Sequence, residues 1–158
     1  MKNFVGKHAL KVTFADPRAG WLGLEIITPQ GEFREVVSYT PNDFPLELSA
    51  ALSLVLQGMD ATATASCEPI TYELTFCPSP HLDLLHFQIT KYPDSKRNRA
   101  DGVAVLCVKA GVRDVVLPFW LALRGLEGRI SVDTYLDAFH REFPTACLQR
   151  LSHQVGQY

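Results

Sequence analysis

The segment from Thr40 to Met59 constrains the fold more than any other part of the chain, because its apolar residues repeat with helical spacing. Side chains three and four residues apart share one face of a helix. Asp43 is a candidate N-cap, and Gly58 is a natural end because glycine enters the left-handed region at little steric cost. The sequence predicts a helix over about 43–58 with a buried face made of Phe44, Leu48, Ala51, Leu52, Val55, Leu56 and Met59.

The opposite face of this predicted helix carries two leucines among polar residues. Leu46 and Leu54 fall beside Asp43 and Glu47, where a simple surface helix would be polar. One interpretation is that a second layer of the chain covers the leucines, which agrees with the general burial preference of leucine. The other is an exposed apolar spot rimmed by acids, which would suit a protein partner.

Segments with the two-residue alternation of half-buried strands flank this helix on both sides. Strands are predicted at 8–14, 21–28, 33–39, 70–76, 82–90, 103–108 and 112–117. A turn at Pro29–Gly31 pairs the second and third of these strands as a hairpin. Residues 118–126 fit either a short helix or an extension of the preceding strand.

A second amphipathic helix is predicted over about 131–143, where Ser131 is a good N-cap and Asp133 lies in the first turn. The order of elements is then strands, helix, strands and helices. That order predicts an α+β fold, a mostly antiparallel sheet with the central and C-terminal helices packed on it. At 158 residues, 1–158 is expected to form a single globular domain.

Composition excludes several classes of protein. A hydrophobic content of 47% with 20% charged residues is that of a soluble globular chain, so wholesale disorder is excluded. The net charge of −2 argues against general binding of nucleic acids. No apolar run is long enough to span a bilayer, and the N-terminus lacks the pattern of a secretory signal. These features predict a cytoplasmic protein without a membrane partner.

The residue types that carry chemistry are present without the spacing that chemistry requires. The four cysteines are widely separated with no CxxC pair, which predicts neither a metal site nor a cofactor. His81 and Asp83 would share a strand face, which is the geometry of an oriented histidine, but the sequence ties no nucleophile to them. No glycine-rich phosphate loop occurs. The chain is therefore expected not to be an enzyme.

Charge is segregated along the sequence. Residues 35–90 contain seven acids and no lysine or arginine, whereas residues 91–113 contain six basic residues and only two acids. Spread around the surface, the acids would only solvate the protein; gathered on one face, they would steer a basic partner. The basic loop 92–102 is expected to be an exposed hairpin tip. The alternative is contact with nucleic acid through Lys96, Arg97 and Arg99, which three basic residues beside one aromatic residue support only weakly.

The layout of the chain resembles that of small immunity proteins of bacterial polymorphic toxin systems, especially the wall-associated-protein immunity type. Order and spacing over roughly 10–143 carry the resemblance, through Trp21, Leu22, Leu24, Ile26, the turn Pro29–Gly31, then Phe44, Leu46, Leu48 and Gly58. The resemblance implies a non-enzymatic cytoplasmic protein that binds and blocks a cognate toxin, and many such toxins are basic nucleases. These families share no catalytic residues that would carry over to this chain.

The sequence thus predicts an interaction protein whose acidic surface binds a protein partner, most concretely a cognate toxin. The expected partner-binding residues are Asp43, Leu46, Glu47, Leu54, Asp60, Glu68, Glu73 and Asp83. The alternative is a small-molecule-binding or enzymatic domain with a pocket between sheet and helices. Its expected lining residues are Trp21, Tyr72, His86 and Trp120.

Overall fold

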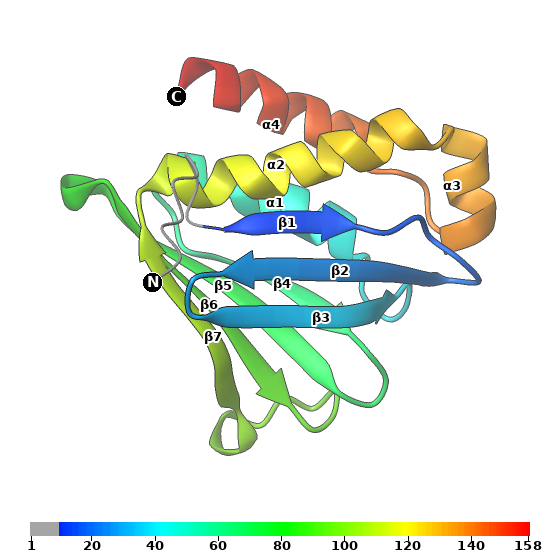
Figure 1. The fold of residues 1–158 in the computed structure, drawn as a ribbon, viewed down its shortest axis with the longest axis horizontal. Helices are drawn as coiled ribbons and strands as arrows, with labels where there is room; N and C mark the ends of the chain where they lie inside the picture. Colours follow the sequence, from blue (N-terminus) through cyan, green and yellow to red (C-terminus); the bar gives the residue numbers. More distant parts are fainter. Residues whose placement is uncertain (1–9) are drawn as a thin grey trace.

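Two antiparallel sheets make up the β structure of the protein (Figure 1), described by a computed structural model over residues 10–158. The first sheet has the order β1-β2-β3 and the second the order β4-β5-β6-β7. The strands are β1 (Lys11–Phe14), β2 (Trp21–Thr28), β3 (Gly31–Ser38), β4 (Ala61–Ser66), β5 (Thr71–Ser79), β6 (Leu84–Tyr92) and β7 (Val103–Ala110). Every neighbouring pair is consecutive in sequence, so each sheet is a simple meander.

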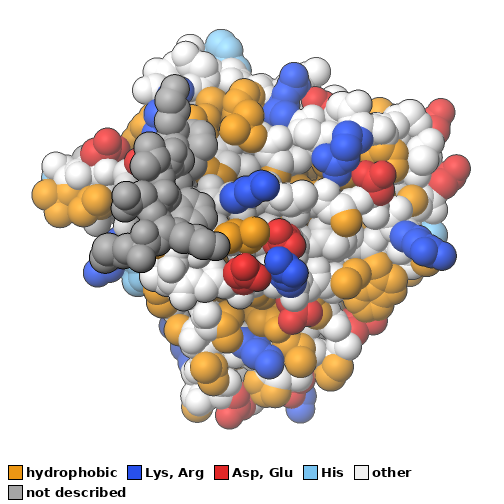
Figure 2. Space-filling view, viewed as in Figure 1, with side chains coloured by type: hydrophobic (Ala, Val, Ile, Leu, Met, Phe, Trp, Pro, Cys, Tyr) orange, Lys and Arg blue, Asp and Glu red, His pale blue; other side chains and the backbone are white. Residues whose placement is uncertain are grey.

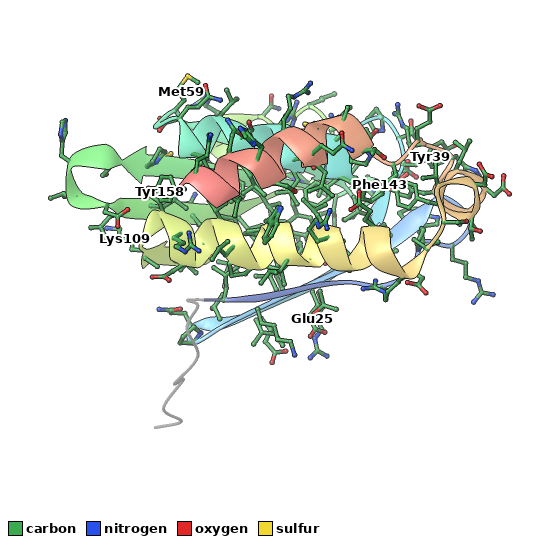
Figure 3. The ribbon with its side chains drawn as sticks, turned by 90° about the horizontal axis from the view of Figure 1, so that it is seen from above. Glu25, Tyr39, Met59, Lys109, Phe143 and Tyr158 are labelled. Atoms are coloured by element: carbon green, nitrogen blue, oxygen red, sulfur yellow. The ribbon has the colours of Figure 1, made fainter. Side chains whose placement is uncertain are left out.

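Four helices pack against these sheets. They are α1 (Phe44–Leu56), α2 (Val112–Arg129), α3 (Val132–Phe139) and α4 (Thr145–Gln157). In Figure 1, α2 and α4 cross the top of the molecule, α3 lies at the right, and the three-stranded sheet lies in front with α1 behind. Seen from above in Figure 3, α4 lies over α1 and α2, while α2 runs beside β1. Helix α1 runs beside β4, at the edge of the second sheet.

Both sheets and the helices share one hydrophobic core. Phe33 of β3 meets Tyr72 of β5 edge to face, with ring centroids 4.9 Å apart. Further along the same face of β5, Phe119 of α2 packs edge to face on Phe76 and on Phe87 of β6, at 5.5 and 5.3 Å. Aromatic pairs prefer these geometries. The inner face of the second sheet therefore shares one continuous core with the first sheet and with α2.

The predicted α+β class with mostly antiparallel strands is confirmed, although the strands form two sheets instead of one. Helix α1 separates the two sheets along the chain, because it is inserted between β3 and β4 and buries one side in the core. The helix spans 44–56 within the predicted 43–58, and Asp43 caps it by accepting a hydrogen bond from the Leu46 N–H at 3.4 Å. Gly58 follows the helix with a φ of +83°, as expected of a helix end.

The prediction of a strand over residues 112–117 is wrong, because this segment begins α2. Val112, Val115, Val116 and Phe119 follow helical spacing, and all four are buried. The β-branched valines favoured a strand, and Pro118 suited the start of a short helix as well as an extension of that strand. Burial of this face outweighs the backbone hydrogen bond that Pro118 cannot donate inside the helix.

The predicted helix over 131–143 is present but ends earlier, at Phe139. Ser131 caps it as expected, accepting from the Thr134 N–H at 3.2 Å. His140 adopts a left-handed conformation with φ of +63°, which stops the helix, and a separate helix α4 starts at Thr145. The start of the first predicted strand, residues 8 and 9, lies outside the described residues.

Candidate functional site

A partly exposed apolar stripe runs along the outer side of α1. Leu46 is 42% exposed and Leu54 is 39% exposed, and Ala50 between them is also exposed. The three residues are spaced four apart, so they line up on one side of the helix. Of the two interpretations of these leucines, the structure matches the exposed spot, since no described residue fully covers them.

The stripe lies between α4 and the edge strand β4. On the α4 side, the Ser53 hydroxyl donates to the side-chain oxygen of Gln154. On the β4 side, the Glu47 carboxylate accepts a hydrogen bond from the backbone N–H of Thr64 at 3.2 Å. An edge strand leaves some backbone N–H groups unpaired, and Glu47 accepts from one of them. This hydrogen bond protects the edge from pairing with a strand of another chain. We call the surface made of Asp43, Leu46, Glu47, Ala50 and Leu54 the α1 face.

Asp43 is the acid at the N-terminal end of the α1 face. Burial raises the pKa of its carboxyl above the ordinary value of 3.8, and the Leu46 N–H and the Arg141 charge lower it by less. Arg141 is fixed nearby, because its guanidinium donates to the backbone oxygens of Tyr39 and Pro41 at 2.8 and 3.3 Å. The cap therefore holds a carboxylate that is partly desolvated beside one cation.

Two other predicted partner-binding acids lie near the ends of β4. Asp60 is exposed just before the strand, close enough to Cys77 that its charge, after burial, helps to raise the pKa of that thiol. Glu68 is exposed just after the strand, where it accepts a hydrogen bond from the Ser38 hydroxyl at 3.2 Å. Asp60 therefore extends the acidic margin beyond the C-terminal end of α1, and Glu68 lies at the opposite end of β4.

The remaining two acids lie elsewhere. Glu73 is on the face of the four-stranded sheet that points away from the helices, and it forms an ion pair with Arg97 at 3.0 Å. Asp83 is in the turn between β5 and β6, where it accepts from the Tyr158 hydroxyl at 3.3 Å. The eight predicted residues thus do not form one surface. The structure brings Asp43, Leu46, Glu47 and Leu54 together, with Asp60 at the margin.

The catalytic candidates do not converge. His81 and Asp83 lie in the turn before β6 instead of sharing a strand face, and His86 is on β6 itself. Burial, followed by the Glu35 charge, raises the pKa of the Cys67 thiol to about 12, which keeps it protonated and unreactive. Within residues 10–158, no group of three or more His, Cys, Asp or Glu side chains has a metal-binding arrangement.

The residues expected to line a pocket between sheet and helices lie in different layers. Tyr72 is buried in the core, and His86 is on the outer face of β6. Trp120 of α2 donates its indole N–H to the Ser152 hydroxyl of α4 at 2.8 Å. A cavity among α1, α2 and α4, lined by Leu56, Val116 and Val155 among others, has a volume of only about 10 Å³. That volume holds no more than a single water molecule.

Larger hollows lie on the outer faces of the two sheets. One of about 410 Å³ crosses the three-stranded sheet, where Glu25 pairs with Arg34 at 3.0 Å and points away from the helices in Figure 3. Another of about 470 Å³ lies on the four-stranded sheet beneath the loop 93–101. We call the second one the polar hollow. Its lining residues are Thr62, Glu73, Thr75, Thr90, Tyr92, Lys96, Arg97 and Arg99.

The surface over the three-stranded sheet and α2 carries both signs of charge. Figure 2 shows acidic and basic side chains interspersed there, with hydrophobic side chains scattered between them. Arg34 contributes to this mixture through ion pairs with Glu25 and Glu32. This face therefore offers no field of a single sign to a charged partner.

None of the helices in the described chain has the length and apolarity needed to cross a bilayer. Comparison with known proteins assigns neither a family nor a function. No family model, no curated protein and no solved structure matches this chain.

Proposed function

We propose that this chain is a non-enzymatic protein-binding domain of the immunity type, which blocks a cognate toxin by covering it with the α1 face. The observation that carries the proposal is the exposed stripe of Leu46 and Leu54 flanked by Asp43 and Glu47. An apolar centre with a polar, charged rim is the common anatomy of protein interfaces. The resemblance of the layout to immunity proteins supplies the class of partner.

The apolar stripe provides part of the binding energy. Fully burying a leucine is worth roughly 1.5–3 kcal/mol, so covering the exposed two-fifths of each side chain contributes about 1 kcal/mol. A stable complex needs about 800 Å² from each partner, which is more than two leucines supply. The contact must therefore extend along α1 to Met59, which projects at the end of the helix (Figure 3). Met59 is 44% exposed, so its predicted place on the buried face is wrong.

The acids of the α1 face favour a basic partner. Asp43, Glu47 and Asp60 carry the same sign along one side of α1 and its C-terminal continuation. Such charges act mainly by steering encounter and fixing orientation, and the screening length is about 8 Å at physiological salt. Binding by this face is accordingly expected to weaken as ionic strength rises.

Chemical features of the candidate nucleophiles support a binding role over catalysis. The pKa values of Cys67 and Cys77 are both raised by burial, which disfavours the thiolate. His81 and Asp83 lie in one turn, and the Asp83 carboxylate accepts a hydrogen bond from the Tyr158 hydroxyl. None of these four residues is placed beside a partner as acyl or phosphoryl transfer would require.

Protection of cells against the toxin tests the proposed function. A candidate toxin, the product of a gene adjacent to that of this chain, is expressed together with the wild-type chain, with Leu46→Gln/Leu54→Gln, or with Leu121→Gln. Glutamine is a good helix former, so the double variant removes apolar surface while keeping the helix. Leu121 is the matched control, since it is 49% exposed but lies on α2.

We expect growth with the wild-type chain and with Leu121→Gln, and loss of protection with the double variant. Protection by the double variant equal to that of wild type would remove the α1 face from the mechanism. Failure of the wild-type chain to protect would overturn the immunity function itself.

A further inference from the structure

The polar hollow is formed because the loop after β6 folds back over the outer face of the four-stranded sheet. The sequence indicated an exposed hairpin tip here. Instead, Arg97 turns inward, and its Nη1 donates to the Thr64 hydroxyl and to the Glu73 carboxylate, both at 3.0 Å. These partners lie on β4 and β5, so a single side chain ties the loop to two strands.

The loop has a defined internal structure. The Asp94 carboxylate accepts from the backbone N–H of Lys96 at 2.9 Å, and residues 99–101 form a 3₁₀ turn. Gly102 then passes close to the sheet, since a Cβ atom there would lie 2.8 Å from Cε1 of Tyr92. Lys96 and Arg99 thus extend from an anchored loop above the hollow.

The charges of the hollow are unbalanced. Arg97 is paired with Glu73, which is the only acid in the lining. Lys96 and Arg99 form no ion pair with an acid of the described residues. Two cations therefore remain available to a ligand.

Hydroxyl groups line the rest of the hollow. Thr62, Thr75 and Thr90 all point to the outer face of the sheet. The Thr90 oxygen already accepts from the amide of Gln88 at 3.0 Å, so its own hydrogen is free to donate. Donors next to unpaired cations are a combination that suits an oxygen-rich anion.

We propose that the polar hollow binds a small molecule that carries a phosphoryl group. Arg99 and Lys96 bind the phosphoryl oxygens, and the threonine hydroxyls bind the polar remainder of the molecule. The volume of about 470 Å³ lies within the range of roughly 300–1,000 Å³ of small-molecule sites, which exceeds the need of phosphate alone. Tyr92 is buried, so no exposed aromatic ring is available there to stack nucleic-acid bases.

Glu73 sets the strength of this site. Its carboxylate occupies Arg97 and also repels an incoming anion, so it opposes phosphoryl binding on both counts. Substituting Glu73→Gln releases the Arg97 charge without changing side-chain size. The proposal therefore requires that Glu73→Gln and the loss of Lys96 and Arg99 act in opposite directions.

Titration calorimetry at low ionic strength tests the site with glucose 6-phosphate and AMP, with glucose and adenosine as uncharged counterparts, and with inorganic phosphate alone. The variants are Lys96→Gln/Arg99→Gln and Glu73→Gln. Lys109→Gln is the control, because Lys109 is exposed on β7 and does not line the hollow. Circular dichroism of each variant verifies that the fold is kept.

We expect at least one phosphate ester to bind, about tenfold or more weaker binding in the double variant, tighter binding in Glu73→Gln, and no change in Lys109→Gln. Failure of both esters to bind, equal weakening by Lys109→Gln, or binding of inorganic phosphate as tight as that of the esters would overturn the proposal. The site is independent of the α1 face, so toxin protection and ester binding can fail separately.

Discussion

Asp43 has two opposing effects on stability at the residue scale. Its side chain caps α1, and an N-cap contributes about 1 kcal/mol. Its partial burial raises its pKa, which means that the folded protein disfavours the charged form. Burial, followed by the same charge, raises the pKa of the Tyr135 hydroxyl, while Arg141 lowers the pKa of Asp43. Ionisation of Asp43 therefore lowers the stability of the folded protein, and the hydrogen bond from the Leu46 N–H offsets that loss.

Asp43→Asn separates these two effects, because asparagine caps as well as aspartate but cannot ionise. A folded-state pKa above the unfolded value contributes stability that is fully present below pH 3.8 and is lost as pH rises through the folded pKa. We therefore expect the unfolding free energy of Asp43→Asn, relative to wild type, to increase from pH 4 to pH 7. Urea denaturation at several pH values measures it, with the exposed Asp137→Asn as control. A difference that is constant with pH would contradict the argument.

Helix α1 has to bury one side completely while leaving the other side open, which is the main constraint at the scale of the element. Phe44, Leu48 and Leu52 are fully buried, whereas Leu46 and Leu54 are not. If the exposed leucines serve binding, their removal costs little in stability. If they serve the core, their removal is as costly as that of a buried leucine.

Leu52→Ala is expected to lower the unfolding free energy by about 2–5 kcal/mol, since it leaves a cavity in the core. Leu46→Gln and Leu54→Gln are each expected to change it by about 0.5 kcal/mol or less, as for ordinary surface positions. Urea denaturation of the three variants measures these values. A loss above about 2 kcal/mol for either glutamine variant would show that the stripe is part of the core.

The sequence was sufficient to predict elements whose pattern is local. Helix α1 and the β2–β3 hairpin were predicted because spacing, cap and turn residues agree within each segment. The first part of helix α2 was missed, since Val112, Val115 and Val116 fit both strand propensity and helical spacing. For residues 118–126, a helix was one of the two alternatives, and the structure matches that one. Only packing of this segment against β1 and β6 decides between the two structures.

Site residues were predictable only where they shared one element. Asp43 and Glu47 are four residues apart on α1, so their common side followed from helix geometry. The pairing of Glu73 with Arg97 joins a strand to a loop 24 residues later, and no local pattern indicates it. The polar hollow was missed for the same reason, because the fold-back of loop 93–101 depends on that long-range contact.

At the scale of the whole molecule, the two sheets are joined by a shared core and by a hydrogen bond between strands. The Tyr72 hydroxyl of β5 donates to the Glu35 carboxylate of β3 at 2.7 Å. Burial, together with this hydrogen bond, raises the pKa of Tyr72, which keeps its donor hydrogen in place. Because a hydrogen bond is directional and hydrophobic packing is not, this bond helps to fix the orientation of one sheet relative to the other.

Tyr72→Phe removes this link without changing the volume of the ring. We expect a loss of about 1.5 kcal/mol in unfolding free energy, because the acceptor is a carboxylate. Tyr158→Phe is the matched control, since its hydroxyl contacts Asp83 at the exposed surface and its removal should have little effect. Equal effects of the two substitutions in thermal or urea denaturation would contradict a role for the link between the sheets.

The most direct test of the central claim is recovery of a partner on the tagged chain from lysate of its own source. Wild type, Leu46→Gln/Leu54→Gln and Leu121→Gln are compared side by side, each washed at low and at high salt. We expect one protein to be recovered in equal amount on wild type and on Leu121→Gln, to be lost at high salt, and to be strongly reduced on the double variant. A partner held equally by all three chains, or no partner at all, would contradict binding through the α1 face.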